Sequence, residues 1–183
     1  MTKTERVRAA LCGEKTDHIP VCFWTHMAGF DLDPELLAQK TYEFARSHDI
    51  DFIKTMNNGM YSVEDFGCTL DQSQVKNGGV TKLASSPIHS VQDWAKICEK
   101  DIHTGALGRE LTSLRSLLEK VNGEIPVVFT IMSPMTTAEK LSGGSVIDHL
   151  LDGHEDMVLP ALEAITATTC KLAEEVVHMG AAG

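Results

Sequence analysis

Two short apolar runs of the same form constrain the fold of this chain more than any other feature. IPVCFWT occupies residues 19–25 and IPVVFTI occupies residues 125–131. Continuous apolar runs of this length are typical of strands buried on both faces, as in a parallel sheet. A third apolar segment, DFIKTM at 51–56, lies between them. We therefore predict strands at 19–25, 51–56 and 125–132.

Helices separate the predicted strands. Asp33 followed by Pro34 indicates a helix start, because aspartate caps the first free N–H groups and proline suits the first helical position. The spacing of apolar residues predicts helices at 34–48, 105–121 and 157–179. Alternating strands and helices indicate parallel strands joined by crossover helices. The predicted fold class is therefore α/β.

The composition is that of an ordinary globular protein. The chain has 183 residues, of which 43% are hydrophobic and 23% are charged. No stretch approaches the roughly 18 to 20 uncharged apolar residues of a membrane helix. The N-terminal segment carries charges throughout and has no apolar signal region. We expect a cytoplasmic location and no membrane partner.

Charge and cysteine spacing exclude two further classes of function. The formal net charge is −10, and the basic residues are spread along the chain. A nucleic-acid surface needs clustered cations, so we predict no nucleic-acid partner. The five cysteines form no CxxC pair. This spacing favours reduced thiols over a disulfide scaffold or a structural zinc site, and we predict no metal ligands in this chain.

Four segments carry a resemblance to a known family. They are RVRAALCGEKTDHIPV (6–21), DIDFIKTMNNGMYSVEDFG (49–67), PVVFTIMSPMTTAEKLSGG (126–144) and EEVVHMGAAG (174–183). In this order they resemble the N-terminal portion of the uroporphyrinogen decarboxylase superfamily, which also contains corrinoid-dependent methyltransferases. The resemblance implies a (β/α)8 TIM barrel, in agreement with the alternation of strands and helices.

The number of predicted strands is too small for a closed barrel. Such a barrel typically needs about 250 residues, whereas this chain supplies about three strands. We therefore expect a single domain over 1–183 that is the N-terminal part of a barrel and is incomplete in this chain. We expect the chain alone to be catalytically inactive without missing or partner-supplied segments, and a homo-oligomer is one way to supply them. The non-enzymatic alternative is a folded fragment that acts as an interaction module.

The candidate site residues lie where predicted strands end, because barrel enzymes place their chemistry at the carboxyl ends of the strands. We predict catalytic roles for His26 and Asn58. We predict substrate-binding roles for Trp24, Lys54, Asn57, Tyr61, Ser133 and Thr136. Structural alternatives stay open for all of them except Trp24: a hydrogen-bonded histidine, an Asn-Asn-Gly turn, a lysine that extends to solvent and a pair of helix-capping hydroxyls.

The sequence departs from the decarboxylases at two motifs. Those enzymes carry a segment of the form RQAGRYLPE whose arginines bind the propionates of the substrate. Here the segment is HMAGFDLDPE, with His26 and Phe30 or Asp31 in place of the arginines. The aspartate of their SDI motif falls on Asn58 when the segment is aligned back from Gly67. An amide cannot offer the charge-assisted hydrogen bonds of a carboxylate to pyrrole N–H groups.

These departures favour the methyltransferase branch of the family. The resemblance then implies methyl transfer between a small methylated substrate or a thiol and a corrinoid protein. Decarboxylation of uroporphyrinogen III, in porphyrin and heme biosynthesis, is the alternative.

The resemblance also sets the expected cofactors. In a full-length relative it implies a corrinoid and zinc. The zinc ligands, a His-x-Cys and a later Cys, belong to the second half of the barrel and are absent here. For this segment we predict no firmly bound cofactor. The expected partners are a small-molecule, tetrapyrrole or corrinoid substrate and a corrinoid protein.

Overall fold

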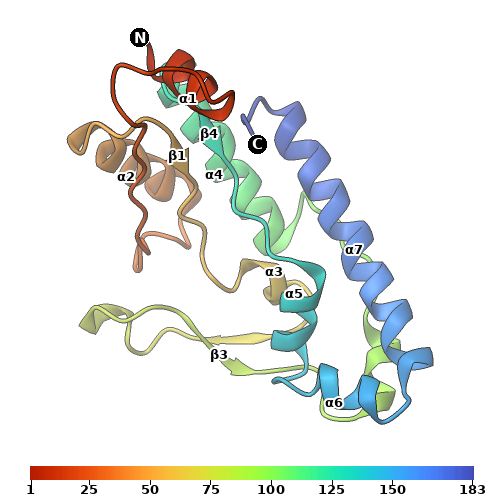
Figure 1. The fold of residues 1–183 in the computed structure, drawn as a ribbon. Helices are drawn as coiled ribbons and strands as arrows, with labels where there is room; N and C mark the ends of the chain where they lie inside the picture. The colour runs from red at the N-terminus through yellow and green to blue at the C-terminus, as the bar shows by residue number, and fades with distance from the viewer. The chain divides into compact units, whose positions relative to one another are not determined.

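The computed structural model describes residues 1–183, and the chain divides into two compact units (Figure 1). Unit 1 contains Met1–Asn58, Glu110–Thr130 and Glu175–Gly183. Unit 2 contains Gly59–Arg109 and Ile131–Glu174. The predicted alternation of strands and helices is confirmed, and the fold is α/β with parallel strands joined by helical crossovers.

Unit 1 is built on a parallel ladder. Strand β1 (Ile53–Lys54) pairs in parallel with β4 (Val127–Val128), and Ile53 lies opposite Val127. Backbone hydrogen bonds extend the pairing past these bounds, from Ile53 N to Pro126 O at 2.8 Å and from Thr55 N to Val128 O at 2.9 Å. The predicted strands at 51–56 and 125–132 therefore pair as expected, with shorter regular cores.

Two further segments pair with the outer edges of this ladder. On the β1 side, Asp51 N donates to Val21 O at 2.8 Å. On the β4 side, Ala182 N donates to Val127 O at 2.7 Å and Phe129 N donates to Gly183 O at 2.8 Å. The end of the chain therefore runs beside β4 (Figure 1). The spatial order of the four segments follows the chain, as in the wall of a (β/α)8 barrel.

The prediction of a doubly buried strand at 19–25 is wrong. The segment is extended, but it is not a regular strand. Its apolar side chains are open to solvent, with Ile19 82% exposed and Phe23 52% exposed. The physical reason is its place at the edge of the ladder, where it has a pairing partner on one side. An apolar run shows that a segment could be buried, but it does not show that other segments of the protein cover it.

Two of the three helices described for unit 1, α2 and α4, begin where the sequence predicts. Helix α1 spans Lys3–Leu11, α2 spans Pro34–Ser47, and α4 spans Gly105–Val121, whose first turn belongs to unit 2. The Asp33 side chain accepts a hydrogen bond from Leu36 N at 3.0 Å, with Pro34 in the first turn. The predicted helices at 34–48 and 105–121 are confirmed.

An ion-pair cluster joins α1 to the start of β1. The Arg6 guanidinium donates to the carboxylates of Asp17 and Asp51, and Asp51 also accepts from Val21 N at 2.8 Å. The Arg6 guanidinium holds the pKa of Asp17 well below its usual range. Burial alone would raise the pKa of Asp51, but the Val21 N–H and Arg6 outweigh it and lower that pKa. The cluster thereby ties the 19–25 segment to the ladder.

Unit 2 combines short helices with one antiparallel hairpin. Its elements are α3 (Tyr61–Glu64), β2 (Thr69–Asp71), η1 (Val75–Asn77), β3 (Lys82–Ser85), η2 (Val91–Lys96), α5 (Pro134–Leu141), α6 (Val146–Leu151) and most of α7 (Glu155–His178). Strands β2 and β3 pair with each other. Helix α7 confirms the prediction at 157–179. None of the helices combines the length and apolar character needed to cross a membrane.

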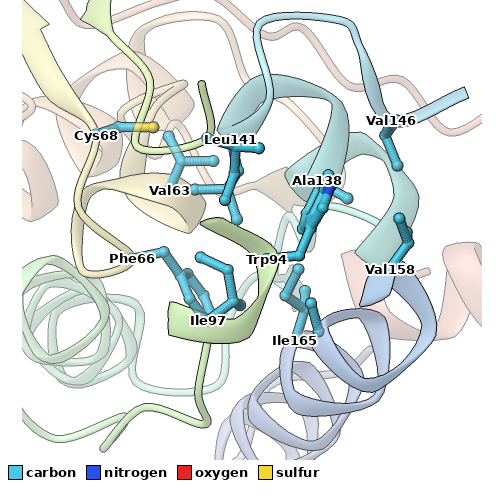
Figure 2. Close-up of a cluster of buried hydrophobic side chains, with 12 residues drawn as sticks. Val63, Phe66, Cys68, Trp94, Ile97, Ala138, Leu141, Val146, Val158 and Ile165 are labelled. Carbon is cyan, nitrogen blue, oxygen red and sulfur yellow. The ribbon is translucent and has the colours of Figure 1, made fainter. Parts of the chain in front are cut away.

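The core of unit 2 is a cluster of buried apolar side chains (Figure 2). Trp94 from η2 is 1% exposed and packs among aliphatic residues of α5, α6 and α7, including Leu141 and Ile165. Its indole Nε1 donates to His149 Nδ1 at 3.0 Å. The polar end of the tryptophan is thus satisfied while its rings fill the cluster.

The N-terminus of α4 is capped by a residue far away in sequence. The Asp65 carboxylate accepts hydrogen bonds from Ala106 N and Leu107 N, both at 2.8 Å. Gly105 has φ +58°, and a Cβ atom there would lie 2.0 Å from Asp65 Oδ1. Glycine is therefore required both by the backbone conformation and by the close approach of the capping carboxylate.

Candidate functional site at the carboxyl ends of the strands

Thr55, at the end of β1, is the centre of a hydrogen-bond network in unit 1. Its hydroxyl donates to Asn57 Oδ1 and accepts from Thr130 N at 2.9 Å. Its backbone carbonyl accepts from Thr130 Oγ1 at 3.0 Å and from Trp24 Nε1 at 3.1 Å. Three neighbouring segments of the ladder are therefore joined at a single residue that is 5% exposed.

Asn57 is held at both ends of its amide group. Its Oδ1 accepts from the Thr55 hydroxyl, and its Nδ2 donates to Glu110 Oε2 on α4 at 2.8 Å. Asn57 is 6% exposed and Glu110 is fully buried. This geometry favours a framework role for Asn57, which fixes the loop after β1 to helix α4.

Asn58 is paired with a carboxylate. Its Nδ2 donates to Asp31 Oδ2 at 2.9 Å, and both side chains are buried. Sequence comparison with the decarboxylases places an amide at position 58 where they have an aspartate. The structure places the carboxylate of Asp31, from the loop after the 19–25 segment, beside the Asn58 amide. The two side chains form one buried acid–amide pair.

Trp24, His26 and Lys54 form an open aromatic patch in unit 1. Trp24 is 39% exposed, and the His26 ring meets its ring edge-on with the ring centroids 4.6 Å apart. The Lys54 ammonium lies 4.0 Å from the centroid of the Trp24 ring. Ile53 and Thr55 are buried whereas Lys54 between them is only half-buried. Lys54 therefore points to the opposite, less covered face of the ladder, and the patch lies with it.

The remaining predicted site residues belong to unit 2. Ser133 caps α5, with its hydroxyl accepting from Thr136 N at 3.1 Å and donating to Thr136 Oγ1 at 3.0 Å. Ser133 and Thr136 therefore take part in the helix cap that was their structural alternative to substrate binding. Tyr61 begins α3, is 1% exposed and lines a small internal cavity with Ser62 and Phe66. Its burial argues against direct contact with a substrate.

The donor atoms of the chain do not form a metal site. No three His, Cys, Asp or Glu side chains lie together in an arrangement that could hold a metal ion. Cys22 and His26 lie in the same extended segment but belong to no such group. The residues present therefore do not fit zinc.

Sequence reasoning missed three residues of this site. Asp31, Thr55 and Glu110 are all buried at the strand ends and hydrogen-bonded to predicted residues or to the ladder. One signal was available for Glu110, an acidic residue on the otherwise apolar side of a predicted helix. Thr55 carries no such signal, because threonine is common in strands.

Comparison with known proteins identifies the family. The family model for uroporphyrinogen decarboxylase (URO-D) matches residues 2–183. The chain belongs to the uroporphyrinogen decarboxylase family. The predicted resemblance is thereby confirmed over nearly the whole sequence, and the match runs across both compact units.

Two curated relatives of the chain are methyltransferases by name. The chain is 26% identical over 118 residues to the methylcobamide:CoM methyltransferase MtbA of Methanosarcina mazei, covering 64% of this chain and 34% of that protein. It is 22% identical over 177 residues to the MtbA of Methanosarcina acetivorans, covering 88% of this chain and 50% of that protein. The chain therefore spans half or less of the length of these relatives.

A solved structure supports the fold. A methyltransferase from Methanosarcina mazei superposes with a TM-score of 0.79 at 23% identity, over 99% of this chain and 57% of that one. The predicted fold, part of a (β/α)8 barrel, is confirmed by this likeness together with the parallel ladder of unit 1.

Proposed function

We propose that this protein takes part in methyl transfer between a corrinoid protein and a small methylated substrate or thiol. The observation that carries the proposal is the Trp24–His26–Lys54 patch, in which His26 stands at the start of the segment that is rich in arginine in the decarboxylases. The curated methylcobamide:CoM methyltransferases among the relatives support the same reaction class.

The patch suits a large flat macrocycle. Aromatic rings bind flat ligands by stacking and by edge contacts, and Trp24 is open to solvent while its indole N–H is anchored to Thr55. A bound corrinoid would supply the cobalt centre that carries the methyl group. Trp24 would contact the face or edge of the macrocycle, and its anchored ring would orient the ligand without a conformational change.

His26 and Lys54 supply the polar chemistry of the patch. A thiol must lose its proton to become a good nucleophile, and an imidazole nitrogen of His26 is the exposed acceptor next to Trp24. Lys54 makes no ion pair, and its ammonium rests on the Trp24 ring. In this role Lys54 would hold a polar group of the substrate beside the ring while His26 takes the proton.

The decarboxylase alternative lacks its electrostatic basis in unit 1. A substrate with eight carboxylates needs several cations at the site, and each charge-assisted contact is worth roughly 1.5 to 3 kcal/mol. The arginines of unit 1 with ion-pair partners are engaged elsewhere, Arg6 with Asp17 and Asp51 and Arg46 with Glu124. Lys54 is left as the cation of the patch.

Two assays run side by side test the proposal. The protein, expressed with whatever natural sequence follows Gly183, is incubated without oxygen with methylcobalamin and coenzyme M, and demethylation is followed by absorbance. A second sample receives uroporphyrinogen III, and coproporphyrinogen III is measured. We expect demethylation in the first assay and no product in the second.

The variant Trp24→Ala should lower the demethylation rate about two- to tenfold, since stacking contributes roughly 0.5 to 1.5 kcal/mol beyond the buried area. Phe23→Ala removes another exposed aromatic ring, which faces His48 outside the patch, and is the matched control, with a rate close to that of the unmodified protein. Coproporphyrinogen III formation without demethylation would overturn the proposal.

A further inference from the structure

The ladder between β1 and β4 changes its hydrogen-bond pattern at the last pair. With Ile53 opposite Val127, a regular parallel ladder would continue with a bond from Thr130 N to Thr55 O. Instead Thr130 N donates to the Thr55 hydroxyl, and the Thr130 hydroxyl donates to the Thr55 carbonyl. The two threonines have exchanged backbone and side-chain partners.

The exchange leaves one acceptor position on the Thr55 carbonyl. A carbonyl oxygen has two lone pairs, and the Thr130 hydroxyl uses one of them. The Trp24 indole N–H takes the other at 3.1 Å. If Thr130 N also returned to this carbonyl, three donors would compete for two positions.

We infer that Thr55 is a positioning residue whose hydroxyl holds the Trp24 indole in place by keeping Thr130 N away from the Thr55 carbonyl. The inference deepens the proposed function and rests on it for the ligand, because the indole it fixes is the ring that would contact the corrinoid. Thr55 itself touches no substrate in this account.

The variant Thr55→Val keeps the shape of the side chain and removes the hydroxyl. Thr130 N then loses the hydroxyl as its acceptor, and the acceptor that a regular parallel ladder provides is the Thr55 carbonyl. The Trp24 indole is then the donor that can be released to solvent. Thr55→Ser restores the hydroxyl. Thr130→Val removes the other hydroxyl of the exchange, which relieves the carbonyl of one donor and leaves the indole bond intact.

The readout is the fluorescence of Trp24, obtained as the difference between each protein and the same protein carrying Trp24→Phe. We expect a red shift and a lower anisotropy in Thr55→Val, and spectra like those of the unmodified protein in Thr55→Ser and Thr130→Val. Thr137→Val, which removes a buried hydroxyl in unit 2, should leave Trp24 unchanged.

Binding of methylcobalamin gives the second readout. The dissociation constant should rise at least about fivefold in Thr55→Val, in line with the loss of one well-placed hydrogen bond, and should stay unchanged in Thr55→Ser.

An unaltered Trp24 spectrum in Thr55→Val, or a shift in Thr55→Ser, would overturn the inference. Should Thr55→Val fail to fold, a red shift in Thr130→Val would overturn it. If the unmodified protein does not bind methylcobalamin, the proposed function fails while the Trp24 spectra still decide this inference.

Discussion

The two compact units keep their interiors together by different means. Unit 2 buries a cluster of apolar side chains around Trp94, and the polar side chains buried in this unit, such as Ser142 and Thr168, carry hydroxyl groups. Unit 1 places charged and amide groups inside, with Asp51, Asn58 and Glu110 each at most 1% exposed. Apolar packing depends on volume, whereas a buried polar network depends on every donor and acceptor having its partner. Unit 1, the unit that carries the candidate site, is the one that buries charged and amide groups beside its apolar residues.

The largest expected effect comes from removing volume in unit 2. Trp94→Ala deletes the largest fully buried side chain and should lower the free energy of unfolding by about 3 to 5 kcal/mol. Trp94→Phe retains most of the apolar volume and should lower the free energy of unfolding clearly less than Trp94→Ala does. Urea unfolding followed by circular dichroism measures both. Equal losses in the two variants would show that the indole bond to His149, and not packing, dominates.

The matching change in unit 1 keeps volume and removes polarity. Asn57→Leu is close in size, yet it leaves the Thr55 hydroxyl without its acceptor and Glu110 Oε2 without the Asn57 donor. We expect a loss of about 1 to 3 kcal/mol in the free energy of unfolding. An unchanged free energy of unfolding in Asn57→Leu would show that these buried polar contacts do not stabilise unit 1, and would contradict the comparison.

A third variant tests the cap between Asp65 and α4. Gly105→Ala forces a Cβ atom against the capping carboxylate and into a left-handed backbone conformation, and should cost about 2 kcal/mol or more. Gly153→Ala shares the positive φ, but its Cβ would meet no neighbour within 4 Å. Gly153→Ala should lower the free energy of unfolding by only the cost of the left-handed backbone conformation, about 1 kcal/mol. Similar thermal unfolding midpoints in the two variants would remove the Asp65 contact from the explanation.

Acid should weaken the ion-pair cluster of unit 1. The folded pKa values of Asp17 and Asp51 lie below the value of about 3.9 expected in the unfolded chain. The unfolded state therefore takes up more protons as the pH falls, and the stability that the cluster adds is present above about pH 4 and is lost below it. Urea midpoints from pH 6 to pH 3 should fall less steeply in Asp17→Asn than in the unmodified chain. Parallel curves would contradict this account of the cluster.

The smallest effect concerns thiol reactivity and leaves stability unchanged. Cys68 lies in the core of unit 2, and burial raises its pKa to about 11. Cys12, Cys98 and Cys170 are exposed. At pH 8 the Cys68 thiol should react with iodoacetamide at least about 100-fold more slowly than these three, because the thiolate is the reactive form. Mass spectrometry of the labelled peptides distinguishes the sites, and rapid labelling of Cys68 would show that the core of unit 2 opens.

Local signals predicted the helices and the strand order well, because caps such as Asp33-Pro34 act within a few residues. The burial of 19–25 could not be predicted in this way, since it depends on neighbours that the run itself does not encode. The site shows the same division. The positions of Trp24, His26 and Lys54 follow from strand ends, whereas the Asn58–Asp31 and Asn57–Glu110 pairs join residues 27 and 53 positions apart. No local pattern indicates such contacts.

The most direct test of the central claim, that the Trp24 patch is a corrinoid-binding surface, is a fluorescence titration with methylcobalamin. The chain has two tryptophans, of which Trp24 is exposed and Trp94 is buried. We predict saturable quenching after correction for absorbance. The quenching should disappear in Trp24→Phe, where only the emission of Trp94 remains. Quenching that is absent, that does not saturate, or that persists unchanged in Trp24→Phe would contradict the claim.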